Sequence, residues 1–136
     1  MTNDATNAKR DELLRKPHTA VLATQWTRGR VHQAPVWYLY EDGAFKIITG
    51  RGSQKHRNVE RNGRASICVD EREGRFAYVL AEGPVSVVDP VSFEQRFALH
   101  RHYRGEEGAH RAVDGGGHEK MVMLVLRPER WISWGL

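Results

Sequence analysis

The sequence predicts a mainly β protein, a small antiparallel β-barrel with flanking helices, formed by residues 1–136 as a single domain. Short strand-like runs separated by glycine-containing turns recur along the chain, and closely spaced short strands are typical of barrels. Helix-like segments occur only as insertions between these runs. The chain has 136 residues, of which 40% are hydrophobic, and this is sufficient for one core of common domain size.

The first part of the chain is predicted to contain one short helix and three strands. The helix covers Asp11–Lys16 and ends at Pro17, because proline cannot continue a helix. The turn signals Arg28-Gly29 and Asp42-Gly43 indicate hairpins between the strands. The strands expected here are His18–Thr24, Val31–Tyr40 and Ala44–Thr49.

The middle and the end of the chain are predicted to add a helix and three more strands. The helix covers Ser53–Asn62 and is followed by Gly63, a usual residue after a helix C-terminus. The run Met121–Leu126 is apolar on both faces, so we expect a second copy of the chain to cover its outer face. The strands expected here are Ala65–Asp70, Phe76–Val88 with an interruption at Gly83-Pro84, and Met121–Leu126.

A third helix is expected between the last two strands. Asp89 is its predicted N-cap, Pro90 takes its first position, and Gly105 lies just past its end. The segment 105–118 that follows contains five glycines and few apolar residues. It is interpreted as an irregular surface loop, and a mobile lid over a substrate remains the alternative.

Composition and cysteine usage exclude several classes of protein. No apolar run is long enough to cross a bilayer, and the N-terminus lacks the apolar core of a signal peptide. Cys68 is the single cysteine, so no disulfide can form within the chain. We therefore expect a soluble cytoplasmic protein. His100 and His102 are two residues apart and would face different sides of a helix, so we expect exposed histidines and no metal site.

The most informative segment is Thr49–Asn58, where glycines and Ser53 precede a basic helix. Free N–H groups at a helix start, reinforced by basic side chains, can bind a phosphate. From Arg51 to Arg64 there are five Lys or Arg residues and one acid, a net charge of +4. The whole chain has 21 basic and 17 acidic residues, also a net charge of +4. The excess charge is therefore local, which predicts one anionic ligand and no nucleic acid, whose grooves use extended basic tracks.

Several segments in a fixed order carry a resemblance to a known family. They are Val21–Thr24, Gly29-Arg30, Pro35–Tyr38, Thr49–Val59, Arg64–Ile67, Ala81–Gly83 and Leu126–Trp131. With them the chain resembles the split β-barrel superfamily of pyridoxamine-phosphate-oxidase-like flavin and deazaflavin proteins. It is most similar to the short branch that uses coenzyme F420, a deazaflavin hydride carrier. The resemblance implies an FMN-binding-like split β-barrel that forms a homodimer, with the cofactor in the groove between subunits.

The resemblance also implies which residues bind the cofactor. Lys55 and its neighbours would hold the phosphate, and parts of two strands would line the ring. The full set is Ala34, Pro35, Val36, Trp37, Ile48, Thr49, Gly50, Arg51, Ser53, Gln54 and Lys55. The residue types agree with this, because Lys is a point charge suited to a phosphate and Pro35-Val36-Trp37 is an apolar wall suited to a flat ring. For Trp37, a position in the core is an equally good interpretation.

Three functions remain in view. The first is an F420-dependent oxidoreductase that passes a hydride to a small unsaturated or electron-poor molecule. F420 carries a long acidic tail beyond its phosphate, so Arg51, Arg57 and Arg61 favour it over FMN. The second is an FMN-dependent oxidoreductase of the same fold. The third is a non-enzymatic binding module for a heme-like ligand or nucleic acid. No catalytic acid or base is assigned in any of them.

Overall fold

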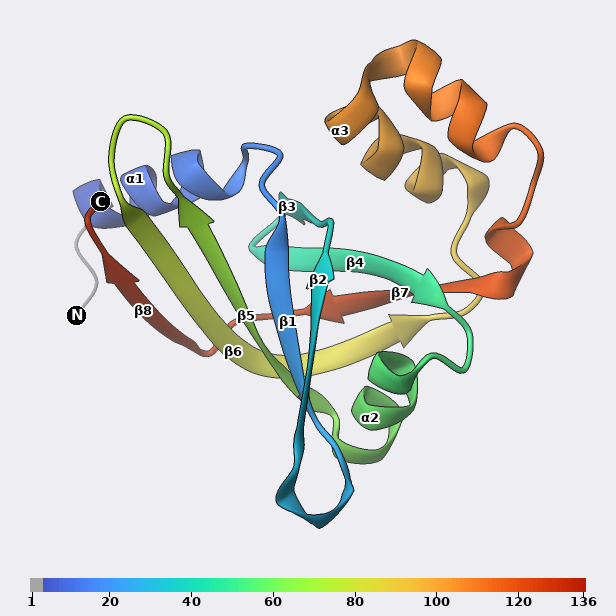
Figure 1. The fold of residues 1–136 in the computed structure, drawn as a ribbon, viewed down its shortest axis with the longest axis horizontal. Helices are drawn as coiled ribbons and strands as arrows, with labels where there is room; N and C mark the ends of the chain where they lie inside the picture. Colours follow the sequence, from blue (N-terminus) through green and yellow to red (C-terminus); the bar gives the residue numbers. More distant parts are fainter. Residues whose placement is uncertain (1–3) are drawn as a thin grey trace.

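The computed structural model describes residues 4–136 and shows a mainly β molecule with helices at its edges (Figure 1). The α-helices are α1 (Asp4–Leu14), α2 (Gln54–Asn62) and α3 (Phe93–Val113). The strands are β1 (Ala20–Gln25), β2 (Val31–Val36), β3 (Leu39–Glu41), β4 (Ala44–Gly50), β5 (Arg64–Glu71), β6 (Ala77–Val88), β7 (Met121–Leu126) and β8 (Arg130–Trp134). None of the helices within residues 4–136 is long and apolar enough to cross a membrane.

The strands form one curled antiparallel sheet in the order β2-β1-β5-β6-β7-β4-β3, and β8 pairs with β6. The chain passes directly from β2 to β3, which lie at opposite ends of this order, so Trp37-Tyr38 closes the barrel. The predicted mainly β barrel with flanking helices is confirmed. The prediction of one strand over Val31–Tyr40 is wrong, because this run changes partner: β2 pairs with β1 and β3 pairs with β4.

The long strand β6 belongs to both halves of the sheet. Its residues up to Pro84 pair with β5, while Val85–Val88 pair with β7. The predicted interruption at Gly83-Pro84 is therefore wrong, and the strand changes partner there without breaking. Gly83 is required at this point because a Cβ atom would lie 2.1 Å from the carbonyl oxygen of Arg127.

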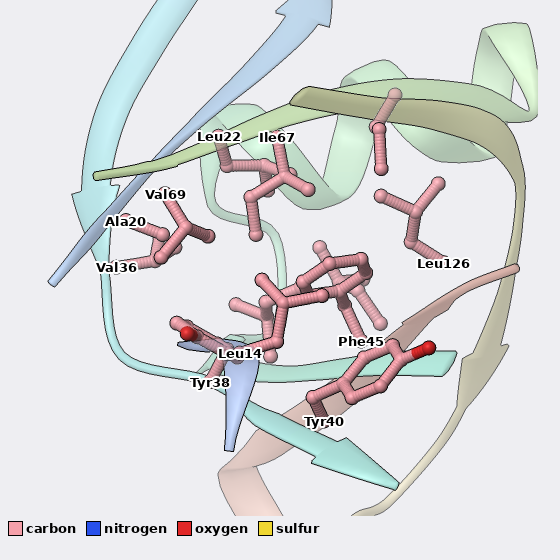
Figure 2. Close-up of a cluster of buried hydrophobic side chains, with 14 of the residues drawn as sticks. Leu14, Ala20, Leu22, Val36, Tyr38, Tyr40, Phe45, Ile67, Val69 and Leu126 are labelled. Carbon is pink, nitrogen blue, oxygen red and sulfur yellow. The ribbon is translucent and has the colours of Figure 1, made fainter. Parts of the chain in front are cut away.

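The barrel interior is filled by one cluster of apolar side chains, shown in part in Figure 2. Residues of α1, β1, β4 and β5 meet there, and Leu14, Phe45 and Val69 are fully buried. Tyr38 and Tyr40 also belong to this cluster and pack against Phe45. The two tyrosines are thus core residues, on the opposite side of the chain from Trp37.

A second, smaller cluster covers the outer face of β7. Met123 and Val125 pack there against Ala44 and Val91, and Val91 is held over the strand by a hydrogen bond from its N–H to the Met121 carbonyl oxygen (2.9 Å). The strand is therefore buried on both faces, as predicted, within a single chain. The expectation that a second copy covers this face is wrong.

Two helix boundaries differ from the prediction. Helix α1 begins at Asp4, well before the expected Asp11. Helix α3 has Ser92 as its N-cap, because Ser92 and Gln95 form a reciprocal capping box. Asp89, the predicted cap, instead forms an ion pair with Arg51.

The predicted irregular segment 105–118 is mostly helical. Gly105 is non-helical, with φ 78° and ψ 176°, so the first leg of α3 ends there as predicted, and a second leg continues to Val113. Figure 1 shows α3 as two legs at the edge of the molecule far from β8. Arg96 joins the legs by donating hydrogen bonds to the carbonyl oxygens of Gly116 (2.7 Å) and Ala112 (3.4 Å). Basic side chains near a helix C-terminus are stabilising because the free carbonyl groups there are partly negative.

Helix α2 is fixed to the barrel by a buried amide. Its bounds agree with the prediction, with Ser53 as N-cap and Gly63 in the left-handed conformation after its last turn. Asn58 is 0% exposed, and its Nδ2 donates to Thr24 Oγ1 on β1 (3.0 Å). Its Oδ1 accepts from Gln54 Nε2 (2.7 Å) and Arg61 Nη2 (3.1 Å). The Asn58 side chain thus joins α2 to β1 and also links two other side chains of α2.

We expect Asn58→Ala to lower the free energy of unfolding by about 1–3 kcal/mol, because it leaves the buried Thr24 hydroxyl without its partner. Urea denaturation followed by circular dichroism measures this. Asn62→Ala is the matched control, since Asn62 is exposed on the same helix, and its effect should stay within about 0.5 kcal/mol. Equal losses in the two variants would contradict a special role for Asn58.

Candidate functional site

A hollow of about 400 Å³ lies between the end of β2, the end of β4 and helix α3. We call it the α3 groove. Its lining residues are Pro35, Val36, Trp37, Ile48, Thr49, Gly50, Lys55, Arg96, Leu99, His100 and Met121. Seven of the eleven residues predicted to bind a cofactor are among them. The structure therefore brings together two strand segments and Lys55, as the sequence predicted, and adds a wall from α3 that it did not.

The start of α2 is organised by short-range hydrogen bonds. Ser53 Oγ accepts from the His56 N–H (3.4 Å) and lies 3.0 Å from Thr49 Oγ1. The Gly52 N–H donates to His56 Nδ1 (2.9 Å), and Gly52 has the positive φ of 83° that favours glycine. The backbone N–H groups of Gln54 and Lys55 follow in the first turn, where no intrahelical acceptor exists. This end of the helix can therefore receive an anion.

Lys55 is the cation that accompanies this helix start in the groove. Its Nζ donates to Thr49 Oγ1 (3.3 Å), and within residues 4–136 it forms no ion pair. The side chain is half-buried. A partly desolvated ammonium that contacts only a hydroxyl has strong remaining affinity for an anion.

Other predicted phosphate ligands are engaged elsewhere. Arg51 binds Asp89 through Nε (3.0 Å) and the Glu119 carbonyl oxygen through Nη2 (2.8 Å). The hydrogen bond from Arg51 to Asp89 lowers the pKa of Asp89 below its ordinary value. Gln54 is bonded to Asn58 and accepts a hydrogen bond from Arg57 (2.6 Å). The structure thus places Arg51 and Gln54, together with Ser53 and Ala34, outside the lining of the groove.

Trp37 forms a wall of the groove together with α3. Its ring stacks on Tyr103 at 4.3 Å with an interplanar angle of 3°. The guanidinium carbon of Arg104 lies 5.1 Å from the Trp37 ring centre, and His100 meets the ring edge-on at 6.1 Å. Trp37 therefore faces the groove and not the barrel core.

Tyr103 attaches α3 to the barrel. Its hydroxyl accepts a hydrogen bond from the Tyr38 N–H (3.0 Å) and donates one to the His18 carbonyl oxygen (2.7 Å). Burial raises the pKa of Tyr103 to about 12, so the hydroxyl remains a donor at neutral pH. The contact joins the helix to the barrel at the β2–β3 crossing.

Sequence reasoning missed the groove residues Arg96, Leu99, His100 and Met121. It expected exposed histidines, but His100 is half-buried and lines the groove. Burial, followed by the charges of Arg96 and Arg104, lowers its pKa. The spacing of four between Arg96, His100 and Arg104 was the available signal, because such residues share one face of a helix. Within residues 4–136, no cluster of His, Cys, Asp and Glu has the arrangement of a metal site.

One known family matches almost the whole chain. The family model described as pyridoxamine 5'-phosphate oxidase matches residues 6–135. No curated protein matches the chain in sequence.

Solved structures share the fold at low sequence identity. An F420 reductase is 20% identical, with a TM-score of 0.73, over 90% of this chain and 94% of that one. A FAD-binding protein from Mesorhizobium loti is 17% identical, with a TM-score of 0.69, over 93% of this chain and 91% of that one. The heme storage protein HutZ from Vibrio cholerae is 20% identical, with a TM-score of 0.68, over 93% of this chain and 92% of that one. The fold is thus the split β-barrel that the sequence predicted.

We expect Tyr103→Phe to loosen α3, because it leaves the Tyr38 N–H and the His18 carbonyl without their partner, at a cost of about 1–3 kcal/mol. Amide hydrogen exchange should become faster in residues 93–113 while β5 and β6 stay protected. Tyr78→Phe is the matched control, because Tyr78 lies on the outer sheet face against Trp134. If α3 exchanges at the parent rate in Tyr103→Phe, the helix is held by other contacts.

Proposed function

The chain is a member of the pyridoxamine 5'-phosphate oxidase family, and from this premise we propose that it is an oxidoreductase that binds a phosphate-bearing deazaflavin or flavin in the α3 groove. The observation that carries the proposal is Lys55, a cation without an ion pair in the described residues, placed at the start of α2 beside an apolar wall. A phosphate requires a cation and N–H donors, whereas a flat ring requires an apolar surface, and this groove contains both.

In this proposal the residues of the chain bind and orient. Lys55 and the first N–H groups of α2 hold the phosphate, and Thr49 positions the lysine. Pro35, Val36 and Trp37 present the ring with a surface that excludes water. The cofactor, when bound, supplies the hydride chemistry, and the protein places a small unsaturated or electron-poor substrate against it.

We propose coenzyme F420 as the cofactor, with FMN as the alternative. Arg57 and Arg61 are exposed on α2 beyond the groove and bind only neutral acceptors, Gln54 in one case and Gln25 and Asn58 in the other. Their charges remain available to an acidic tail that extends past the phosphate. Arg51 contributes less than the sequence suggested, because Asp89 neutralises it. A purified protein that carries stoichiometric FMN would reverse this choice.

A heme-like ligand is a second candidate, because His100 is a potential axial ligand in the groove. Titration with hemin would then give a sharp Soret band that is absent in His100→Gln. If no such band appears on addition of hemin, heme binding through His100 is excluded.

We further propose that the protein acts as a homodimer through the outer face of the sheet. Pairing aligns a row of outward side chains across five strands, and directly paired residues share a face. The row is Pro35, Val21, Cys68, Leu80 and Ile132. Val21 is 41% exposed and Ile132 54% exposed, with Trp134 on the same edge at 57%. Pro35 also lines the α3 groove, so a second copy on this face would lie beside the cofactor.

We expect Lys55→Ala to weaken cofactor binding by about tenfold to a hundredfold, since one charge-assisted phosphate contact contributes roughly 1.5–3 kcal/mol. Its melting temperature should change little, because Lys55 packs on no core cluster. Fluorescence titration with F420 and with FMN measures the affinity. Arg57→Ala is the control in the FMN titration, because Arg57 is exposed, points to Gln54, and FMN has no acidic tail for it to bind. If the two variants bind FMN alike, the phosphate has been placed on the wrong side of α2.

We expect Ile132→Asp to convert a dimer into a monomer, because it buries a charge within the proposed contact. Size-exclusion chromatography with light scattering gives the mass, and cofactor affinity should fall with it. Ser86→Asp adds the same charge at an exposed site of β6 beyond the row and should remain dimeric. A parent protein that is monomeric and still binds cofactor would refute the shared site.

A further inference from the structure

Helix α3 presents a line of basic side chains along the groove. Arg96, His100 and Arg104 are spaced by four residues, so they lie on one face of the first leg of α3. Arg96 and His100 line the groove, and Arg104 lies over the Trp37 ring. We call these three residues the α3 basic row.

No carboxylate forms an ion pair with a member of the α3 basic row in the described part of the chain. The residues that line the groove include Lys55, Arg96 and His100 and not a single Asp or Glu. Arg104 forms no ion pair within residues 4–136, and the acids that follow it are turned to other partners: Glu107 to Arg111 and Glu106 to His110. Charges of one sign gathered in a partly desolvated hollow destabilise the free protein, and an anionic ligand would relieve this.

Arg96 differs from His100 and Arg104 in the hydrogen-bond donors that it has free for a ligand. The Nη atoms of Arg96 already donate to the carbonyl oxygens of Gly116 and Ala112, and only its buried Nε has no partner in the described residues, so Arg96 adds charge but few free donors. His100 Nδ1 has no hydrogen-bond partner in the described residues, and Arg104 contacts only an aromatic ring. His100 and Arg104 are therefore the groups with donors to offer a ligand.

The position of the row indicates which ligand it serves. Lys55 marks one wall of the groove, while His100 and Arg104 gather around Trp37. In the proposed function, Lys55 holds the phosphate and Trp37 borders the ring. An acidic cofactor tail would extend past the phosphate and therefore away from Trp37. A carboxylate near Trp37 would belong to a molecule that meets the ring.

We propose that His100 and Arg104 form a carboxylate-binding subsite, and that the substrate is a small conjugated or aromatic carboxylate. The apolar side chains of Leu99 and Met121 would contact its body, while His100 and Arg104 bind its carboxylate. The proposal rests on the proposed function for the position of the ring, and on the observed charges for everything else.

The test uses 2-naphthoate and its uncharged analogue 2-naphthamide, titrated by calorimetry into the full chain with and without saturating F420. We expect 2-naphthoate to bind at least about tenfold more tightly than the amide. Arg104→Gln and His100→Gln should each remove about tenfold of the naphthoate affinity and leave the amide unchanged. Arg101→Gln is the matched control, since Arg101 is exposed on the same helix against Phe97, outside the groove lining. Melting temperatures confirm that each variant is folded.

The outcomes separate this subsite from the proposed cofactor site. Equal affinity for acid and amide, no naphthoate binding below the millimolar range, or an equal loss in Arg101→Gln would overturn the subsite. A loss of F420 affinity without a loss of naphthoate affinity in Arg104→Gln would also overturn it and assign the row to the cofactor tail. If neither F420 nor FMN binds but the apoprotein still selects naphthoate through His100 and Arg104, the subsite stands and the proposed function fails.

Discussion

The hydroxyl of Tyr103 links helix and barrel at the point where the barrel closes. Between β2 and β3 the chain leaves one end of the sheet and joins the other, and the backbone at Tyr38 needs a partner there that no strand provides. Tyr103 accepts from that N–H and donates to His18, while its ring stacks on Trp37. The position of α3, and with it one wall of the groove, follows from this contact.

Charge is distributed unevenly between the two sides of the groove. Around α2, Arg51 is paired with Asp89 and Arg64, the first residue of β5, with Glu129, while Arg57 and Arg61 bind only neutral amide and carbonyl oxygens. Lys55 in the groove, and Arg104 on the facing helix, form no ion pair in the described residues. A basic segment in a sequence is thus a poor guide to ligands until the acidic partners are placed, because most of its charges stabilise the fold or face water.

The sequence alone predicted the barrel and the cap and end of α2, because these depend on local signals, whereas the seven groove residues were implied by the family resemblance. Alternation, turn glycines and a serine before a helix act within a few residues. It failed where distant segments decide. Asp89 resembles a helix cap but forms an ion pair with Arg51, and the glycine-rich segment after Gly105 was expected to be irregular but forms a second helical leg that Arg96 holds in place. The spacing of Arg96, His100 and Arg104 puts them on one helix face, but the surface that this face meets is set by the placement of α3 by Tyr103.

Strand β6 has a consequence for how the molecule comes apart. Its first part is paired with β5 and β8 and its last part with β7, so each half of the barrel is bonded to the same continuous backbone. Neither half can separate without breaking strand pairing on β6, which runs without interruption through Gly83 from one half into the other. The barrel should therefore unfold as one cooperative unit, and α3, joined to it at few points, as a smaller and less protected one. Motion of α3 beside the α3 groove can then occur without disturbing strands β2 and β4, which line the groove on its other side.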